Sequence, residues 1–369
     1  MLAQLREGGI EAQQEEYWGL PAYIDALVSA DPLGRFILDT EEWSWRFRRL
    51  FICPSSSQEI FTHCPKFLAC DGTFTKARFR QILLFATAID GNDEIVLLAW
   101  AVVESENEDS WAWFFEHLKH ALPELASNVF TLISDRDKGL IKADCAFPKA
   151  TRAYCCLHIA ENVQTKFGLQ ARHLFWKIAR SHSLEGYRRS LGELHTLSSA
   201  AATYLTAIPP TLYAASHFPG FRYGHDTSNI VESTNSSYLE DRDLPILQLL
   251  NSIWHKEMEK RFSRLQKAQA LSDSHRLTPY GQFLLKASIQ YAGRNTVQRS
   301  SNTQARVIEP SHAGQADRQI RIVNLAEHTC SCRRFQEADV PCGHAISFIQ
   351  SLHQQPPIEY MPLYLTQQN

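Results

Sequence analysis

The stretch FLACDGTFTKARFRQILLFATAIDGNDEIVLLAWAVVE, residues 67–104, holds three apolar runs separated by turn residues. The runs are FLACDGTF (67–74), RQILLFATAID (80–90) and EIVLLAWAVVE (94–104), and they are rich in β-branched and aromatic residues. The tetrapeptide DGND between the second and third runs is a hairpin signal. The stretch therefore predicts three successive antiparallel strands.

The residues that follow predict alternating helices and strands. The segments are the amphipathic helix EDSWAWFFEHLKHAL (108–122), the buried strand VFTLISD (129–135), the helix RDKGLIKADCAF (136–147), and RAYCCLHI (152–159), a strand that runs into a helix. Strand, strand, strand, helix, strand, helix, strand is the order of the ribonuclease H-like core. We therefore expect an α/β fold built on a mixed five-stranded sheet.

The rest of the chain predicts an all-helical insertion and a small C-terminal zinc finger around this core. We expect a helical N-terminal segment (1–60), a core in two pieces (61–160 and 226–270), a helical insertion (161–225), a linker with helical character (271–315), a zinc finger (316–352) and a tail (353–369). The expected insertion is rich in basic and histidine residues and has no convincing strand.

Composition excludes several classes of protein. The chain has 369 residues, 44% of them hydrophobic and 21% charged, which is an ordinary globular balance. Its longest apolar run, residues 95–103, is too short to span a bilayer, and the first thirty residues lack the apolar core of a signal peptide. Nine cysteines, three of them in one cluster, argue against a disulfide framework and for a reducing compartment.

The cluster CSCRRFQEADVPCGHA (330–345) has the spacing of a metal site. Cys330 and Cys332 are separated by one residue, nine residues follow, and Cys342 and His344 are again separated by one. Three thiolates and one imidazole suit tetrahedral Zn²⁺, and a closed set of four ligands is typical of a structural site. The pattern resembles the SWIM zinc finger, a module used for contacts with DNA or protein. The alternative is a set of buried core cysteines with an unrelated histidine.

Two carboxylates follow strands that neighbour each other in the expected core. Asp71 lies at the end of the first strand and Asp135 at the end of the fourth, while NIVESTNSSY offers Glu232 on a later helix. Three converging carboxylates would bind two Mg²⁺ or Mn²⁺ ions, the arrangement used in phosphodiester transfer. Singly, each acid has an ordinary explanation: a turn residue, a helix cap and an exposed helix residue.

These motifs together resemble the Mutator-like (MULE) transposases of the DDE class. Three segments resemble the family: residues 67–118, the block ISDRDKGL…FPKATRAYCCLHIAENV and the segment NIVESTNSSY. The resemblance covers about residues 48–350. The resemblance implies that Asp71, Asp135 and Glu232 are catalytic, and it matches Cys155 and His158 with the family's C-x-x-H motif in a supporting role. For that pair the alternative is a core cysteine and a satisfied histidine.

The resemblance implies a nuclear DNA transposase with structural Zn²⁺ and catalytic Mg²⁺ or Mn²⁺. Its partners would be transposon ends and target DNA, with a homo-oligomer left open and no membrane involved. The main alternative is a domesticated, non-catalytic DNA-binding transcriptional regulator, and a third is a protein-interaction module built on the zinc finger. Residues 1–50 contain no cysteine or histidine, so the N-terminal zinc finger of many family members is not expected there.

A basic segment follows Glu232. Residues 251–310 contain ten Lys and Arg against four Asp and Glu, although the whole chain has a net charge of −3. Helical spacing places most of five cations on one face, which predicts contact with the DNA backbone; they are Lys256, Lys260, Arg261, Arg264 and Lys267. The alternative is a solvated helix face that contacts nothing.

Overall fold

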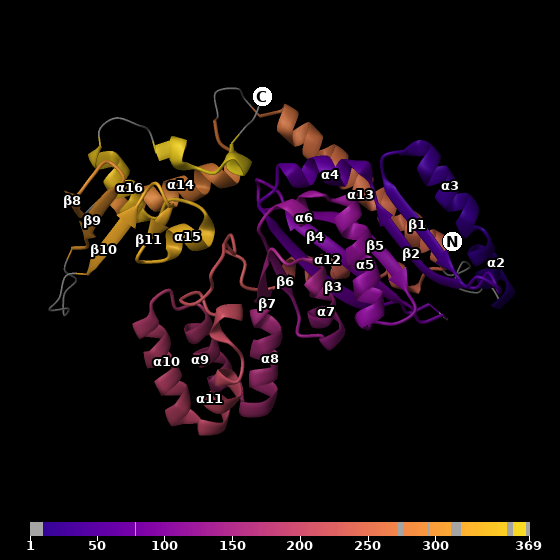
Figure 1. Ribbon diagram of the computed structural model, residues 1–369, viewed down its shortest axis with the longest axis horizontal. Coiled ribbons are helices and arrows are strands. Elements are labelled where there is room, and N and C mark those ends of the chain that lie inside the picture. Colours follow the sequence, from indigo (N-terminus) through magenta and orange to yellow (C-terminus); the bar gives the residue numbers. More distant parts are fainter. Residues whose placement is uncertain are drawn as a thin grey trace. The chain divides into compact units, whose positions relative to one another are not determined.

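The chain divides into two compact units. The computed structural model describes the backbone of residues 10–77, 79–271, 276–293, 295–310, 319–352 and 357–366; the side chains of residues 10–13, 144, 229 and 232 are not among the described parts. Unit 1 contains Met1–Asp90, Ile95–Ala150 and Ser228–Asp273, and unit 2 contains Gly91–Glu94, Thr151–Thr227 and Ser274–Asn369. Figure 1 shows the elements along the chain.

A mixed seven-stranded sheet carries unit 1, and its last strand is where the chain passes into unit 2. The strands are β1 (Arg35–Thr40), β2 (Phe47–Cys53), β3 (Phe67–Phe74), β4 (Ile82–Ile89), β5 (Ile95–Val103), β6 (Phe130–Ser134) and β7 (Ala150–Tyr154), in the order β1-β2-β5-β4-β3-β6-β7. Strand β4 is antiparallel to both β3 and β5, and β6 is parallel to β3. The three antiparallel strands and the neighbouring positions of β3 and β6 are thus confirmed.

The prediction of five strands and a helical N-terminal segment was wrong for residues 35–53. Helices α2 (Ile10–Trp18), α3 (Leu20–Ala30) and α4 (Ser55–Thr62) are present, but β1 and β2 form an antiparallel pair between them. Strand β2 also pairs with β5, so its apolar residues Leu50–Cys53 are buried inside the sheet. A run of four apolar residues carries too little periodicity to distinguish such a strand from a helix.

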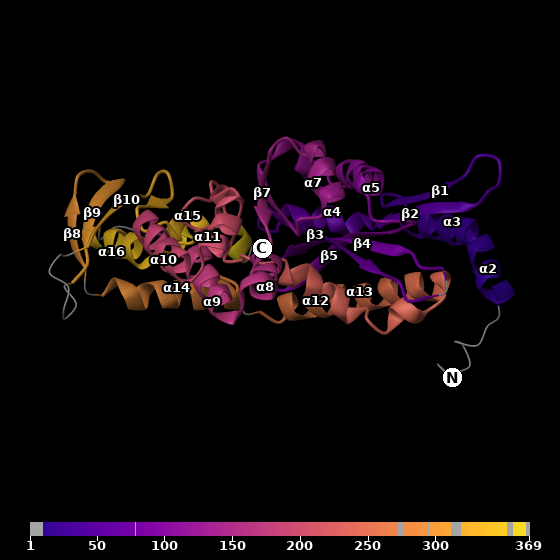
Figure 2. The same ribbon diagram turned by 90° about the horizontal axis from the view of Figure 1, so that it is seen from below.

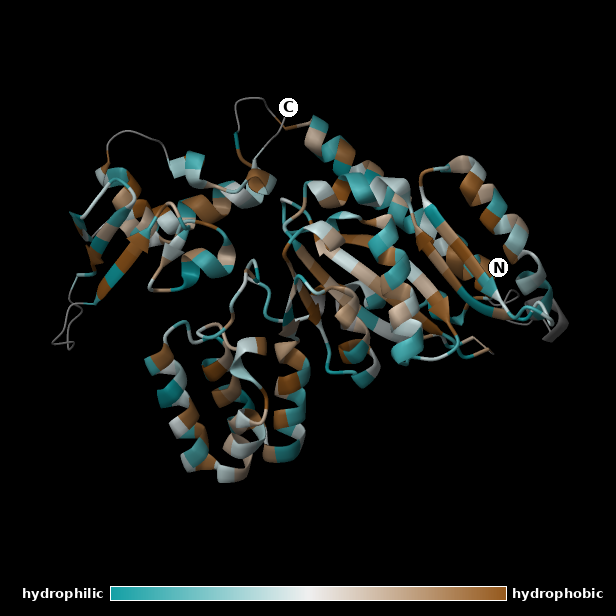
Figure 3. Cartoon of the chain, in the orientation of Figure 1, coloured by the Kyte–Doolittle hydropathy of each residue, from teal (hydrophilic) through white to brown (hydrophobic). Residues whose placement is uncertain are grey.

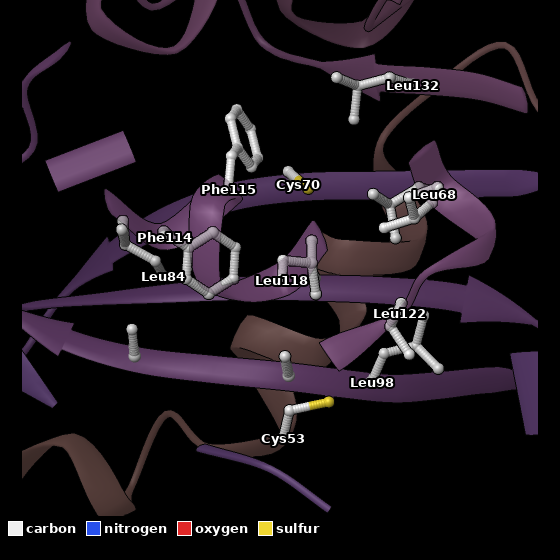
Figure 4. Close-up of a cluster of buried hydrophobic side chains, with 14 of the residues drawn as sticks. Cys53, Leu68, Cys70, Leu84, Leu98, Phe114, Phe115, Leu118, Leu122 and Leu132 are labelled. Carbon is white, nitrogen blue, oxygen red and sulfur yellow. The ribbon is translucent and has the colours of Figure 1, made fainter. Parts of the chain in front are cut away.

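Helix α5 (Glu108–Ala121) covers one face of the sheet. It begins where the Asn107 side chain accepts a hydrogen bond from the amide of Ser110 at 2.9 Å, a typical N-cap. Its buried side chains Phe114, Phe115 and Leu118 lie over β3 and β4 in the cluster that Figure 4 shows. The short helices α6 (Glu124–Ser127) and α7 (Lys138–Ala143) follow.

Helices α12 (Asn229–Ser237) and α13 (Ile246–Gln269) cover the opposite face (Figure 2). The ring of Tyr238, just after α12, stacks on Phe85 of β4 with centroids 5.7 Å apart. Trp254 of α13 contacts Trp100 of β5 edge to face at 6.2 Å. Unit 1 is therefore a three-layer α/β/α arrangement, and Figure 3 shows that its central strands are largely hydrophobic along their length.

Helices make up the first part of unit 2. They are α8 (Cys156–Phe167), α9 (Leu169–Ala179), α10 (Leu184–Leu197) and α11 (Ser199–Thr206), followed by a 3₁₀ turn at Pro210–Leu212. Their shared core contains the buried side chains of Phe175, Leu194, Leu205 and Tyr213. The all-helical character predicted for the insertion is confirmed for these elements.

The C-terminal part of unit 2 joins a small antiparallel sheet to three helices. Its elements are α14 (Pro279–Ala292), β8 (Thr296–Arg299), β9 (Gln304–Ile308), β10 (Ile320–Asn324), β11 (Thr329–Cys330), α15 (Arg334–Ala338) and α16 (Gly343–Ser351). The strand order is β11-β10-β9-β8. One buried cluster includes Val307, Val323, Phe335 and Ile346, so the sheet and the helices share a core.

Two predicted boundaries in this region were wrong. The helical character expected for residues 271–315 is confirmed by α14, but the segment also contains β8 and β9, because the strands beside β10 come from before the cysteine cluster. Within the expected tail 353–369, the described residues 357–366 include packed ones: Leu365 is buried, and its carbonyl accepts a hydrogen bond from the amide of Thr278 at 2.8 Å. Short strands with many exposed polar residues resemble loops in sequence, because their apolar signal is weak.

Candidate active site and candidate zinc centre

Asp71 and Asp135 lie next to each other at one end of the sheet. The parallel pairing of β3 with β6 sets Cys70 opposite Ser134. The next residue along the chain is Asp71 in β3 and Asp135 directly after β6, so the two aspartates are neighbours. Neighbouring strands are about 4.8 Å apart. Two acids separated by 63 residues in sequence are therefore brought side by side, as expected.

Helix α12 is held beside Asp71. The amide nitrogen Nδ2 of Asn235 donates a hydrogen bond to Oδ2 of Asp71 at 2.9 Å. Beyond the helix, the carbonyl of Arg242 accepts from the amide of Lys76 at 2.8 Å. Glu232 lies on α12 one turn before Asn235, where residues share a helix face, but its side chain is outside the described part of the structure.

A third described acid, Glu106, reaches the same end of the sheet and was missed from sequence. Its Oε1 accepts a hydrogen bond from Nε1 of Trp111 at 3.3 Å. A Cβ atom added to Gly72 would lie 2.6 Å from that same oxygen, so the carboxylate occupies the space that a side chain at position 72 would need. Glu106 is one of four acids in ESENED, and only its approach to a glycine of β3 distinguishes it.

The acids crowd negative charge at this end. Burial, followed by repulsion from Asp135 and Asp137, raises the pKa of Glu106 to about 7. Asp137 itself caps α7, accepting hydrogen bonds from the amides of Gly139 and Leu140 at 2.7 and 3.0 Å. The amide of Asp137 in turn donates to Oδ1 of Asp135 at 2.9 Å, which orients that carboxylate.

The chemistry of these acids fits Mg²⁺ or Mn²⁺, with further ligands needed. Among the described side chains, Asp71, Asp135 and Glu106 do not by themselves bring three ligand atoms within 4.8 Å of one another. Mg²⁺ usually keeps several waters and binds one or two carboxylates together with substrate phosphates. Burial is the main cause of the raised pKa of Glu106, and Asp135 and Asp137 add to it, so a divalent cation bound nearby would favour the ionised carboxylate.

Cys155 and His158 lie at the start of α8, in unit 2. Cys155 is the buried residue before the helix and His158 is in its first turn. Within the described residues they do not belong to a group of three metal-binding side chains. Their supporting role stays a prediction.

The basic residues of α13 mostly bind other groups of unit 1. Arg261 donates to Ser57 Oγ at 2.8 Å and to the carbonyl of Leu97 at 3.0 Å. Three more cations have acidic partners: Arg264 pairs with Asp90, Lys256 with Asp241 and Lys260 with Glu257. Lys267 lies in the last turn. Arg261 and Arg264 are therefore directed into unit 1, because α13 covers the sheet, whereas Lys256 and Lys260 keep 38% and 40% of their side-chain surface exposed. For these two lysines and Lys267, DNA contact stays a prediction.

The cysteine cluster forms a compact ligand set. The ligand atoms of Cys330, Cys332, Cys342 and His344 all lie within 4.8 Å of one another, and within the described part of the chain they are the one such group. The sulfurs of Cys332 and Cys342 are 3.6 Å apart, and Nδ1 of His344 is 3.8 Å from two sulfurs. Tetrahedral Zn²⁺ with bonds of about 2.3 Å to sulfur sets its sulfurs about 3.8 Å apart, so the cluster fits this ion.

Neighbouring side chains orient this ligand set. Nε2 of His344 lies 3.1 Å from Oε1 of Glu309, which leaves Nδ1 to face the sulfurs. Glu309 also accepts from Nε of Arg321 at 2.8 Å. Gln336 bonds both the amide and the carbonyl of Cys330 at 3.0 Å. Metal-binding histidines usually have such a carboxylate partner, and sequence reasoning missed it because Glu309 lies 35 residues before His344.

The finger is joined to the helical part of unit 2 through α15. The carboxylate of Glu337 pairs with the buried Arg222 at 2.6 Å and also with His182. The carbonyl of Glu337 accepts from the amides of Arg222 and Tyr223 at 3.0 and 2.9 Å. Arg333, in the left-handed region at φ 63°, donates to the carbonyl of Ala215 at 3.1 Å. The cluster is therefore embedded in unit 2.

Comparison with protein families identifies both regions. Residues 67–162, which include Asp71 and Asp135, match the family model of the MULE transposase domain. Residues 317–351, which include all four cluster ligands, match that of the SWIM zinc finger. The chain thus carries a MULE transposase domain and a C-terminal SWIM zinc finger, which confirms the resemblance read from the sequence. No curated protein was found to match the chain.

Along the described residues, no helix combines the length and the apolar character that crossing a bilayer requires.

Proposed function

We propose that this protein is a Mutator-like DNA transposase of the DDE class, which cleaves and transfers DNA strands. The observation that carries the proposal is the pair Asp71 and Asp135, placed side by side by two parallel strands within the MULE transposase domain. Helix α12, which bears Glu232, is bonded to Asp71 through Asn235. The strand order around these acids also supports a ribonuclease H-like core.

In this proposal the acids bind the metal ion, and neighbouring groups orient the acids through hydrogen bonds. Asp71, Asp135 and Glu232 would hold Mg²⁺ or Mn²⁺, ions that activate the attacking water or hydroxyl and stabilise the leaving oxygen when bound. Asn235 fixes one oxygen of Asp71, and the amide of Asp137 fixes one oxygen of Asp135. Fixed ligands reduce the reorganisation needed when DNA enters the site.

The zinc finger has a structural role in this proposal. Four protein ligands complete the coordination of Zn²⁺ and leave no position for substrate. The finger would contribute DNA or protein contacts from unit 2, and a DNA substrate would require the protein to reach the nucleus. A fluorescent fusion of the full chain that is excluded from nuclei would contradict the nuclear location.

Metal-dependent nicking of supercoiled plasmid DNA tests the catalytic proposal. Asp71→Asn and Asp135→Asn should each slow nicking at least about a hundredfold, because each amide removes a charge worth several kcal/mol to the transition state. Asp25→Asn, at an exposed position of α3, is the matched control and should nick at the normal rate.

Other outcomes separate the alternatives. Nicking that persists in both site variants would show that a contaminating nuclease acts or that other residues are catalytic. DNA binding by the wild-type protein without nicking, in Mg²⁺ and in Mn²⁺, would favour a non-catalytic transcriptional regulator. Absence of DNA binding would favour a protein-interaction module.

A further inference from the structure

A wide pocket lies at the end of the unit 1 sheet on which the acids lie. Its volume is about 830 Å³, and its lining includes Thr40, Gln81 and Glu104, which lie at or beside the ends of β1, β4 and β5. Ile82, the residue after Gln81, pairs with Phe74 at the end of β3. The pocket and the carboxylates therefore lie at the same end of the sheet.

Strand register gives the separation between the pocket and the acids. Asp71 is paired with Phe85, and Gln81 lies four residues before Phe85. At about 3.3 Å per residue, the lining at Gln81 is roughly 13 Å from Asp71 along the sheet. The side chain between them on β3, Phe74, is 64% exposed. A chain bound at the acids is thus within reach of the pocket.

The pocket is lined by aromatic rings that remain open to solvent. Trp18 of α2 and Trp45 of the β1–β2 turn are each 75% exposed. The other aromatic lining residues are Tyr17, Phe47 and Phe79, and Tyr17 packs edge to face against both phenylalanines at 5.3 and 5.6 Å. Tyr17 is itself fixed by donating to Oε1 of Gln81 at 3.0 Å. The floor is therefore rigid, while two indoles project at the rim.

Trp45 occupies a backbone conformation that bulky residues rarely adopt. Its φ is 55°, in the left-handed region. The turn is closed by hydrogen bonds from the amide of Trp45 to the carbonyl of Glu41 at 3.0 Å and from the amide of Glu41 to the carbonyl of Arg46 at 2.9 Å. Glycine would fit this position without strain. A strained, solvent-exposed indole in a tight turn indicates a binding role.

The two arginines of the pocket differ from the other cations near it. Arg46 and Arg80 line the pocket and are exposed, and neither guanidinium has a partner among the described residues. Arg48, two residues after Arg46, lies 3.6 Å from Asp109 and 3.9 Å from Asp39. Arg46 and Arg80 are therefore available to an anionic ligand, which the arginines of α13 are not.

We propose that this aromatic pocket binds unpaired bases of the DNA strand that enters the acidic site, with Trp18 and Trp45 stacking on bases and Arg46 and Arg80 contacting phosphates. Aromatic platforms beside unpaired cations are the features that bind single-stranded nucleic acid without reading its sequence. The identity of the strand rests on the proposed transposase function. The binding of unpaired DNA to the pocket does not depend on that function, and it is tested separately.

Affinity for a fluorescein-labelled single-stranded oligonucleotide, measured by anisotropy without Mg²⁺, tests the stacking. Trp45→Ala should weaken binding about five- to 150-fold, the range found when one base–aromatic stack is removed. Trp43→Ala is the matched control, because Trp43 lies two residues away, is 94% exposed and is outside the lining. An oligonucleotide of the same length with abasic positions should bind the wild type and Trp45→Ala equally.

Trp45→Gly separates binding from folding. Because glycine relieves the left-handed strain, this variant should melt at the wild-type temperature or above while its affinity falls as that of Trp45→Ala does. If Trp45→Gly and Trp45→Ala both bind the oligonucleotide with the wild-type affinity, the proposal is overturned. A change of oligomeric state in sedimentation at unchanged DNA affinity would also overturn it, and would show that the indoles contact a second copy of the chain.

The salt dependence of the same binding tests the arginines. Arg46→Gln should lower the salt slope by about 0.7, the change expected when the protein neutralises one phosphate fewer on single-stranded DNA. Arg48→Gln, whose arginine is paired with carboxylates, should leave the slope unchanged, and equal slopes in the two variants would contradict the assignment. If Asp71→Asn abolishes nicking while Trp45→Ala binds the oligonucleotide normally, the pocket proposal fails and the transposase proposal stands. If Asp71→Asn still nicks DNA while Trp45→Ala loses affinity, the transposase proposal fails and the pocket proposal stands.

Discussion

The acidic end of unit 1 and the cysteine cluster of unit 2 are both candidate metal centres, but they are assembled differently. The four cluster ligands lie within 15 residues, their atoms fall within 4.8 Å of one another, and Glu309 supports His344. The acids come from β3, from the end of β6 and from the junction before α5. Among the described side chains they do not converge to that extent.

This difference has an energetic consequence. The cluster shares one buried core with the surrounding strands and helices, so Zn²⁺ binding and folding of this part are coupled. The acids are placed by a sheet with a large apolar core of its own, and ionisation of Glu106 opposes folding, because burial and then repulsion from Asp135 and Asp137 raise its pKa to about 7. Removing a zinc ligand should therefore destabilise unit 2, whereas neutralising Glu106 should stabilise unit 1.

The largest expected effect is that of Cys342→Ser. It should release Zn²⁺ and unfold the C-terminal part of unit 2, because structural Zn²⁺ contributes on the order of 10 kcal/mol in zinc-finger peptides. Elemental analysis and hydrogen exchange measure the two consequences, and amides of unit 1 should stay protected. Cys145→Ser, at an exposed cysteine of unit 1, should keep the metal. Zinc content equal to the wild type in Cys342→Ser would refute the ligand assignment.

Glu337→Gln should have the next largest effect, because it leaves the buried Arg222 without its carboxylate partner. Burial raises the pKa of Glu337, but the contacts with His182 and Arg222 outweigh it and hold the pKa at about 2. A depressed folded-state pKa stabilises the protein above the unfolded value near 4.5, and this contribution disappears as the pH falls towards 2. The free energy of unfolding at pH 7 should therefore drop by about 3 kcal/mol.

Chemical denaturation at pH 7 and at pH 4.5 and below measures this difference, which should shrink as the pH falls. Glu327→Gln, at an exposed position of the same finger, should change stability little. A drop that is equally large at the lowest pH would mean that the glutamine disrupts packing, not an ion pair.

Glu309→Gln should have a smaller effect, confined to the zinc centre. Loss of the carboxylate that orients His344 should weaken zinc affinity about 10- to 100-fold, the usual cost of losing such a partner. Competition with a chelator of known affinity measures it. Arg321→Gln removes the ion pair with Glu309 but keeps the contact with His344, so its zinc affinity should stay close to normal. Equal losses in both variants would assign the effect to the ion pair.

The smallest effect, and one of opposite sign, is expected for Glu106→Gln. The folded-state pKa of about 7 lies above the unfolded value of 4.5, so ionisation of Glu106 lowers stability as the pH rises from 4.5 through 7. Without divalent metal, the variant should be more stable than the wild type at pH 8, by on the order of 1 kcal/mol after allowance for solvent screening. The difference should vanish below pH 4.5.

Thermal melts across this pH range measure the effect. Glu108→Gln, at the first residue of α5, removes only an exposed ion pair with Lys142 and is the control; it should not become more stable than the wild type at pH 8. If Glu106→Gln destabilises the protein at every pH, the side chain has a packing role, and the contrast between the two centres does not hold at this residue.

Sequence alone determined the features whose signals are local. Apolar runs with turn residues between them predicted β3, β4 and β5, because a strand buried on both faces must be apolar along its length. The zinc ligands were predictable because their spacing is short. The neighbouring positions of Asp71 and Asp135 followed from the expected strand order, and the pairing of β3 with β6 confirms them.

Only the tertiary structure decided the features that depend on which distant surfaces meet. The β1–β2 pair joins the sheet through β5, Glu106 fills the space above Gly72, and Arg261 turns toward the sheet, although its helix has the periodicity of a basic solvent face. None of these has a local signature, because the same residues would suit a loop, a solvated acid or a DNA contact. The physical reason is that periodicity reports how one element divides its polar and apolar sides, whereas burial, ion pairing and pKa depend on the neighbour packed against it.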